Sequence, residues 1–131
     1  MKIFLEEKKG LKEKKVMYST SLPENLNRSL EGAVRALGRK KADWVRGALL
    51  LFLSLSEKEQ EREILRTYKE LEKSRPKPFT TTLFESQLSQ LEQVSKKLKR
   101  SKAEIIRSAV YHFLSLSGTD QEGWIKKTIS G

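Results

Sequence analysis

The sequence matches itself without gaps when it is shifted by 61 residues, and this internal repeat restricts the fold more than any other feature of the chain. The pentapeptide Phe-Leu-Ser-Leu-Ser occurs at residues 52–56 and again at 113–117. Further identical pairs are Thr20 and Thr81, Leu22 and Leu83, Leu30 and Leu91, Arg39 and Arg100, Lys41 and Lys102, and Arg46 and Arg107. The chain therefore contains the same folding unit twice, as a first copy at residues 16–56 and a second copy at residues 78–117.

Both copies begin with a short alternating segment, which predicts a β-strand because successive side chains of a strand point to opposite faces. The strands are expected at residues 16–22 and 78–83. Their core-facing residues would be Tyr18, Thr20 and Leu22 in the first copy, and Phe79, Thr81 and Leu83 in the second. Capping-box spacing, Ser21 with Glu24 and Thr82 with Glu85, predicts that a helix starts directly after each strand.

Two helices are predicted to follow each strand, because apolar residues recur there at intervals of three and four. Gly38 marks the turn between the helices of the first copy, and residues 99–101 form the corresponding turn of the second. The first helices are expected to bury Leu26, Leu30, Ala33, Val34 and Leu37, matched by Leu88, Leu91, Val94 and Leu98. The second helices are expected to bury Val45, Ala48, Leu49, Phe52 and Leu53, matched by Ile106, Ala109, Val110, Phe113 and Leu114.

Three segments lie outside the two copies. Residues 1–15 form a basic N-terminal arm, whose lysines include Lys8, Lys9, Lys12, Lys14 and Lys15. Residues 57–77 are predicted to be a helical charged linker that Pro76 ends, and its apolar residues are Ile64, Leu65, Tyr68 and Leu71. The C-terminal tail at 118–131 is expected to hold a short helix opened by Thr119 and Glu122, with Trp124 and Ile125 as its apolar residues.

The net charge of +10 indicates an anionic partner, and nucleic acid is the commonest one for basic proteins of this size. The excess lies on the arm and on the two copies, since residues 57–75 and 118–131 are each neutral. The absence of cysteine excludes disulfides and thiolate metal sites. The most apolar run, Ala48 to Leu53, is far shorter than the roughly 20 residues of a membrane helix, and the first residues are not those of a signal peptide. We therefore expect a cytoplasmic, nucleoid-associated protein without a membrane partner.

The order strand, helix, turn, helix within about 40 residues resembles the ribbon-helix-helix (Arc/MetJ-like) superfamily of DNA-binding proteins. The resemblance is carried by Ser-Leu-Pro-Glu-Asn-Leu at 21–26, Lys-Ala-Asp-Trp-Val-Arg-Gly-Ala at 41–48 and Lys-Ala-Glu-Ile-Ile-Arg-Ser-Ala at 102–109. In that family two units pair into a two-stranded ribbon that enters the major groove. The resemblance implies a mainly α fold with a short two-stranded antiparallel β-ribbon, arranged as a tandem ribbon-helix-helix pseudo-dimer in a single chain. Pairing of copies between chains is the alternative.

The resemblance also implies that the outward residues of the ribbon contact base edges. These residues are Met17, Ser19 and Ser21 from the first copy, and Pro78, Thr80 and Thr82 from the second. Hydroxyl groups can donate or accept hydrogen bonds and methyl groups can touch thymine, but neither offers the fork that Arg or Asn presents to a base. For Ser21 and Thr82 the alternative is that they only cap the following helix.

A phosphate is implied at the start of the second helix of each copy, where free backbone N–H groups and the helix dipole favour an anion. The phosphate-contacting residues there would be Arg39, Lys40 and Lys41 in the first copy, and Arg100, Ser101 and Lys102 in the second. Lys15 of the N-terminal arm would contact phosphate as well. Ser101 can cap its helix and Lys40 cannot, so the two phosphate sites are expected to be unequal. The alternative is that these basic residues are solvated surface.

The sequence thus predicts a protein that binds double-stranded DNA, as a transcriptional repressor. One alternative is an accessory DNA-binding protein of plasmid transfer (conjugation) or partition. Another is an antitoxin-type interaction module, whose protein partner would bind the C-terminal tail. Self-association on DNA is compatible with each. No enzyme activity, cofactor or metal site is predicted, because the single histidine, His112, has no partner at a recognisable spacing.

Overall fold

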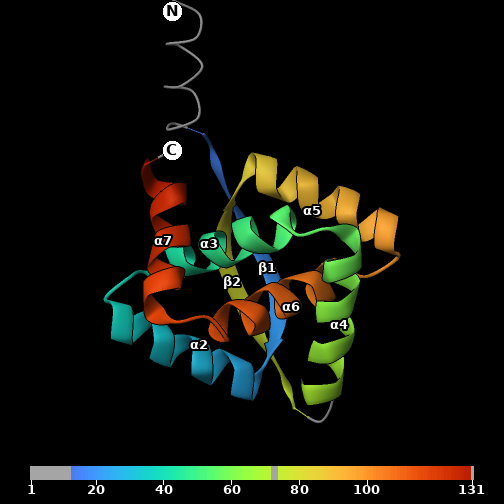
Figure 1. The fold of residues 1–131 in the computed structure, drawn as a ribbon, viewed down its shortest axis with the longest axis horizontal. Coiled ribbons are helices and arrows are strands. Elements are labelled where there is room, and N and C mark those ends of the chain that lie inside the picture. The colour runs from blue at the N-terminus through green and yellow to red at the C-terminus, as the bar shows by residue number, and fades with distance from the viewer. Residues whose placement is uncertain (1–12, 72–73, 131) are drawn as a thin grey trace, which may run out of the picture.

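The computed structural model of the chain describes residues 13–71 and 74–130. Within these ranges the fold is mainly helical, with one two-stranded antiparallel sheet (Figure 1). The elements are β1 (Lys15–Pro23), α2 (Glu24–Leu37), α3 (Lys41–Ser54), α4 (Glu57–Leu71), β2 (Pro76–Phe84), α5 (Glu85–Leu98), α6 (Lys102–Leu114) and α7 (Gly118–Ser130). In this part of the chain no helix combines the length and the apolar character that crossing a membrane requires.

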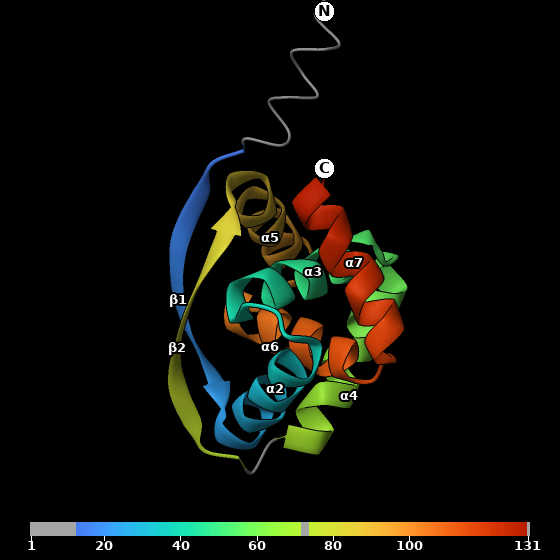
Figure 2. The same cartoon turned by 90° about the vertical axis from the view of Figure 1, so that its left-hand side faces the viewer.

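Strands β1 and β2 pair with each other to form the ribbon, with Ser19 opposite Thr80 at its centre. The ribbon covers one side of the molecule, and helices α4 and α7 lie on the other side (Figure 2). Side-chain exposure alternates along both strands as the sequence predicts, with Phe79 and Leu83 buried and Met17 and Thr80 exposed. Both strands run slightly further than expected, because their pairing continues to Pro23 and Pro76 at one end of the ribbon.

The predicted capping boxes of the first helices are wrong. Ser21 and Thr82 lie within the paired strands, so the N-cap positions fall two residues later, on Pro23 and Phe84. A backbone carbonyl next to the partner strand replaces the side-chain cap. The amide of Glu24 donates to the carbonyl of Arg75, the residue before β2, at 2.8 Å. At the other end of the ribbon, the amide of Glu85 donates to the carbonyl of Lys14 at 3.1 Å. Each ribbon end thereby fixes where a helix starts.

Helices α3 and α6 pack together at the centre of the molecule and supply most of its core. The Trp44 ring meets the Phe113 ring edge-on, with centroids 4.9 Å apart. The expected core residues of these helices are buried, except that Leu53 and Leu114 remain partly exposed. Packing, rather than ligand binding, is therefore the role of Trp44.

The repeat extends beyond the two predicted copies, because α4 and α7 are also counterparts at the same offset of 61 residues. Gln60 and Gln121 each donate a side-chain hydrogen bond to a core carbonyl, that of Phe52 at 3.1 Å and that of Phe113 at 3.0 Å. Ile64 and Ile125 are both buried. Further identical pairs in these helices are Glu61 with Glu122 and Thr67 with Thr128. Each copy is therefore one strand followed by three helices.

The third helix of each copy packs on the other copy: α4 contacts α6, and α7 contacts α3. The predicted opening of the tail helix at Thr119 and Glu122 is wrong, because the hydroxyl of Ser117 accepts from the amide of Asp120 and the helix begins at Gly118. The apolar stripe of α4 also differs from the expected one, since Leu65 and Tyr68 are exposed while Gln60 and Thr67 are buried. The linker and the tail are thus parts of the core.

Gly47 provides a test of the contact between α3 and α7. A Cβ atom at this position would lie 3.0 Å from Cγ1 of Ile125 and 3.2 Å from its Cα, so α7 would have to move back by a few tenths of an ångström to admit a side chain. In Gly47→Ala we expect overpacking to cost about 1–3 kcal/mol, against which alanine adds roughly 1 kcal/mol of helix propensity. The net destabilisation in urea unfolding should therefore be up to about 2 kcal/mol.

The matched control is Gly32→Ala in α2, where a Cβ atom would meet nothing within 4 Å. It should stabilise the protein by about 1 kcal/mol through helix propensity alone. If both variants were stabilised equally, the close packing of α7 on α3 would be refuted.

Candidate nucleic-acid interface

The outward side of the ribbon carries the six predicted base-contacting residues, and the register places them in three cross-strand pairs. Met17 faces Thr82, Ser19 faces Thr80, and Ser21 faces Pro78. At the centre, Ser19 Oγ and Thr80 Oγ1 are 3.1 Å apart and share a hydrogen bond. Met17 is 76% exposed, the highest value among the large apolar side chains of the described residues. The ribbon thus presents a narrow row of uncharged side chains, four of them short hydroxyl side chains, to its surroundings.

Thr82 differs from the other residues of this row because Arg46 holds it. Arg46 is only 4% exposed, and its Nη1 donates to the Thr82 carbonyl at 3.0 Å and to the Thr82 hydroxyl. Its Nη2 binds the carboxylate of Asp43, and the group lies 5.4 Å from the centroid of the Phe84 ring. Arg46 therefore ties the end of the ribbon to the start of α3.

Arg46 is not among the residues that the sequence predicts for the site, although Arg46 and its counterpart Arg107 form one of the identical pairs of the repeat. The signal in the sequence is a cation that recurs at the same place in both copies, among apolar residues of the second helix, where a charged side chain needs a partner.

The starts of α3 and α6 differ, as the sequence predicts. The Ser101 hydroxyl accepts from the amide of Glu104 at 3.1 Å, and a Glu104 carboxylate oxygen accepts from the amide of Ser101 at 2.9 Å. At the start of α3 the N-cap residue is Lys40, whose side chain makes no capping hydrogen bond. The Glu104 carboxylate therefore closes the start of α6, whereas its counterpart in α3, Asp43, binds Arg46 and leaves the start of α3 without a side-chain cap.

Arg39 and Arg100 were both predicted to contact phosphate, and the structure places each in an ion pair with the other copy. Arg39 Nε lies 3.1 Å from both carboxylate oxygens of Glu122, and Arg100 Nη2 lies 3.6 Å from Glu61. The hydrogen bond from Arg39 lowers the pKa of the Glu122 carboxyl and raises that of the guanidinium. These arginines hold α7 and α4 in place, which reduces their availability for phosphate.

Lys41 and Lys102 occupy equivalent places against the ribbon. Lys41 Nζ lies 5.5 Å from the centroid of the Phe79 ring and 3.4 Å from the Glu31 carboxylate. Lys102 Nζ lies at the same distance, 3.4 Å, from Glu92. Burial raises the pKa of the Tyr18 hydroxyl, and the charge of Lys102 opposes that rise. Lys41 thus packs on the strand of the other copy, Lys102 lies near enough to Tyr18 to act on it electrostatically, and an acidic side chain partly neutralises each lysine.

Lys15 and Lys40 are exposed, and both line a hollow of about 430 Å³ at the start of α3. Arg46 and Thr82 line the same hollow, so it joins the end of the ribbon to the open helix N-terminus. Of the predicted phosphate-contacting residues, this pair of lysines is the best placed to meet an anion beside the ribbon. Lys8, Lys9 and Lys12 of the predicted arm lie outside the described residues.

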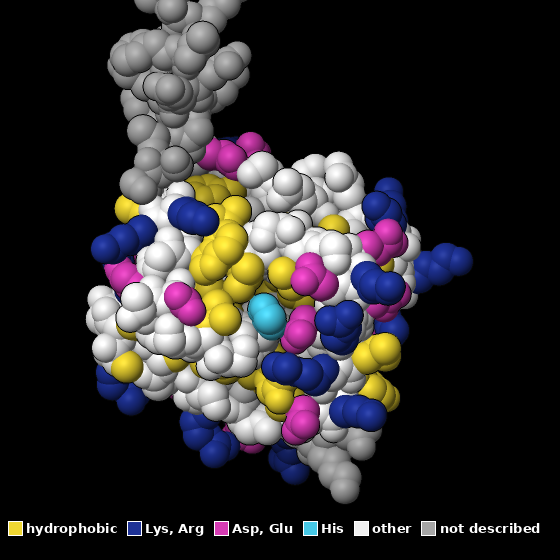
Figure 3. Space-filling model, viewed as in Figure 1, with side chains coloured by type: hydrophobic (Ala, Val, Ile, Leu, Met, Phe, Trp, Pro, Cys, Tyr) yellow, Lys and Arg dark blue, Asp and Glu magenta, His cyan; other side chains and the backbone are white. Residues whose placement is uncertain are grey.

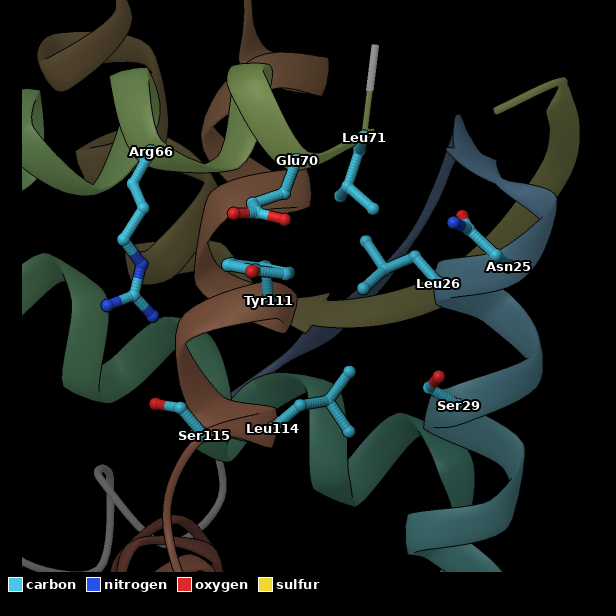
Figure 4. A pocket seen from close by; sticks show the side chains of 9 residues that line it. All are labelled: Asn25, Leu26, Ser29, Arg66, Glu70, Leu71, Tyr111, Leu114 and Ser115. Carbon is cyan, nitrogen blue, oxygen red and sulfur yellow. The ribbon is translucent and has the colours of Figure 1, made fainter. Parts of the chain in front are cut away.

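The face that carries α4 and α7 has a different character, with basic and acidic side chains interspersed over it (Figure 3). A hollow of about 520 Å³ opens between α2, α4 and α6 (Figure 4). Arg66 and Glu70 come to it from the same helix, α4, and Leu26 and Tyr111 form apolar parts of its wall. The charges at this hollow balance, so the ribbon side is the better candidate for a polyanion.

No family model matches the chain, and comparisons with curated proteins and with solved structures give no match either.

Proposed function

We propose that this chain is a tandem ribbon-helix-helix protein, in which two copies form a pseudo-dimer, and that it binds duplex DNA by inserting the ribbon into the major groove. The observation that carries the proposal is the pairing of β1 with β2, which joins the two copies and leaves a row of small side chains outward. The width of the major groove admits a two-stranded ribbon.

The charge distribution supports the same partner. Residues 57–75 and 118–131, which contain the whole of α4 and α7, are each neutral and add nothing to the net charge of +10. Three of the exposed lysines, Lys15, Lys40 and Lys77, lie on the ribbon strands or at the start of α3, and Lys77 pairs with Glu24 at 3.7 Å. In the complex, Met17, Ser19, Thr80 and Pro78 would face base edges, and Lys15 and Lys40 would lie against the phosphates. We expect this binding to repress transcription where the site overlaps a promoter.

The antitoxin-type alternative is weakened by the position of α7. Ile125 is fully buried, and the indole N–H of Trp44 donates to Gln121 at 3.0 Å, so the tail serves the core of this chain. Deletion of residues 118–131 would remove that core contact along with any partner site. Ile129, which is 48% exposed, is the residue whose replacement by serine tests a protein partner without disturbing the core.

Salt dependence of binding is the direct test of the proposal. Fluorescence anisotropy with a labelled mixed-sequence duplex should give an affinity that falls as salt is raised, because cations on the protein release counterions from DNA. With about four phosphate contacts the slope of log affinity against log salt is about −3.6, which is roughly a 100-fold loss between about 50 and 200 mM. An affinity that stays constant over this range would refute DNA binding.

A further inference from the structure

The outward row of the ribbon is unusual in the chemistry that it presents to a base pair. Between Met17 and Ser21 and between Pro78 and Thr82, no outward residue is arginine, lysine, asparagine or glutamine. These are the side chains that read bases by paired or charge-assisted hydrogen bonds. The row consists of one thioether, one proline ring and four short hydroxyl side chains. Recognition of base edges must therefore come from hydroxyl groups, from apolar contacts, or from both.

The hydroxyl groups are largely engaged within the protein. Ser19 and Thr80 hydrogen-bond to each other at the centre of the ribbon. The Thr82 hydroxyl accepts a hydrogen bond from the buried Arg46. Met17 by contrast is 76% exposed, and Pro78 on the opposite strand is also exposed. The most accessible groups of the ribbon are therefore apolar. They are Met17 toward one end and Pro78 toward the other, each two residues from the central Ser19–Thr80 pair.

The major groove contains one apolar feature that distinguishes base pairs, and that feature is the 5-methyl group of thymine. We propose that the ribbon recognises thymine methyl groups, an inference that rests on the proposed function. Met17 would be the main contact on one side of the Ser19–Thr80 pair and Pro78 on the other. Lys15, two residues before Met17, and Lys40 at the start of α3 supply the cations that hold the phosphates near this contact. The preferred sites are accordingly thymine-containing, and the two halves are read by different side chains.

Replacing thymine by deoxyuridine removes this methyl group and nothing else, so it isolates the proposed contact. The probe is the duplex that the protein selects from random sequences, synthesised once with thymine and once with deoxyuridine throughout. Burial of one methyl group corresponds to about a four-fold change in affinity, so loss of two contacts should weaken binding about 16-fold. Met17→Ala should weaken binding to the thymine duplex about four-fold and leave the deoxyuridine duplex nearly unchanged.

Met17→Leu is the matched control, because it keeps an apolar side chain of similar size and should keep most of the discrimination. Met17 is exposed, so neither variant should disturb folding, which circular dichroism checks. Equal affinity for the two duplexes, or a selected site without thymine, would overturn recognition of thymine methyl groups. The proposed function would still stand in that case if duplex binding depended on salt. Failure to bind any duplex in a salt-dependent manner would overturn both.

Discussion

A Trp44→Ala variant is expected to lose about 3–5 kcal/mol of its free energy of unfolding, out of the roughly 5–15 kcal/mol that holds a domain of this size together. The Trp44 ring is fully buried against Phe113, and its N–H group donates to Gln121 on α7. The substitution removes both the packing and the partner of a buried amide oxygen. Urea unfolding followed by circular dichroism measures the loss.

Two further variants separate these contributions. Trp44→Phe keeps an aromatic ring against Phe113 but leaves the Gln121 oxygen without its donor, so it should cost about 1–3 kcal/mol. Ile105→Ala removes the counterpart of Trp44 in α6, which is equally buried but has no polar group. Its cost should be about 2–5 kcal/mol from the cavity alone. A Trp44→Ala variant as stable as the unmodified protein would show that α7 does not close the core at this position.

The double substitution Lys15→Glu with Lys40→Glu is expected to weaken duplex binding about 100-fold at moderate salt, because each reversal replaces an attraction to phosphate by a repulsion. Both lysines are exposed beside the hollow that joins the ribbon to the start of α3. The salt slope should fall by about two, one for each phosphate contact that is lost.

The control must change the net charge equally on another face, and α4 offers it. Lys58→Glu with Lys69→Glu makes the same change in charge at two exposed positions of that helix. Binding measured by fluorescence anisotropy should then weaken only a few-fold, because charges beyond a Debye length, roughly 10 Å, are largely screened. Equal losses for the two double variants would indicate that net charge, and not this site, sets the affinity.

The sequence predicted the ribbon faces and the central helices because both depend on local periodicity, and the repeat allowed each pattern to be read twice. Tyr18 and Phe79, for example, differ in identity but agree in position and in inward orientation. The predicted copies end at Ser56 and Ser117, although the repeat continues into α4 and α7. The solvent-exposed residues of these two helices have diverged, and only sparse identities such as Gln60 with Gln121 mark the shared core contacts.

Contacts between the copies could not be predicted from the sequence, because they join residues far apart in the chain. The pair of Arg39 with Glu122 spans 83 residues, and nothing in the local pattern of either residue indicates it. The helix starts were misplaced for a related reason. Ser21 and Thr82 have good capping spacing, but pairing of the two strands continues through them and prevents them from capping. Long-range pairing therefore overrode a sound local signal in both copies.

The exchange of third helices between the copies has a consequence for synthesis on the ribosome. The first copy emerges with Gly47 and Trp44 uncovered, because their cover is Ile125 and Gln121 in α7. Its strand also lacks β2, the partner that completes the ribbon. The first copy therefore cannot reach its final packing while it is being translated. We expect it to stay partly ordered, with apolar surface exposed, until α7 has left the exit tunnel.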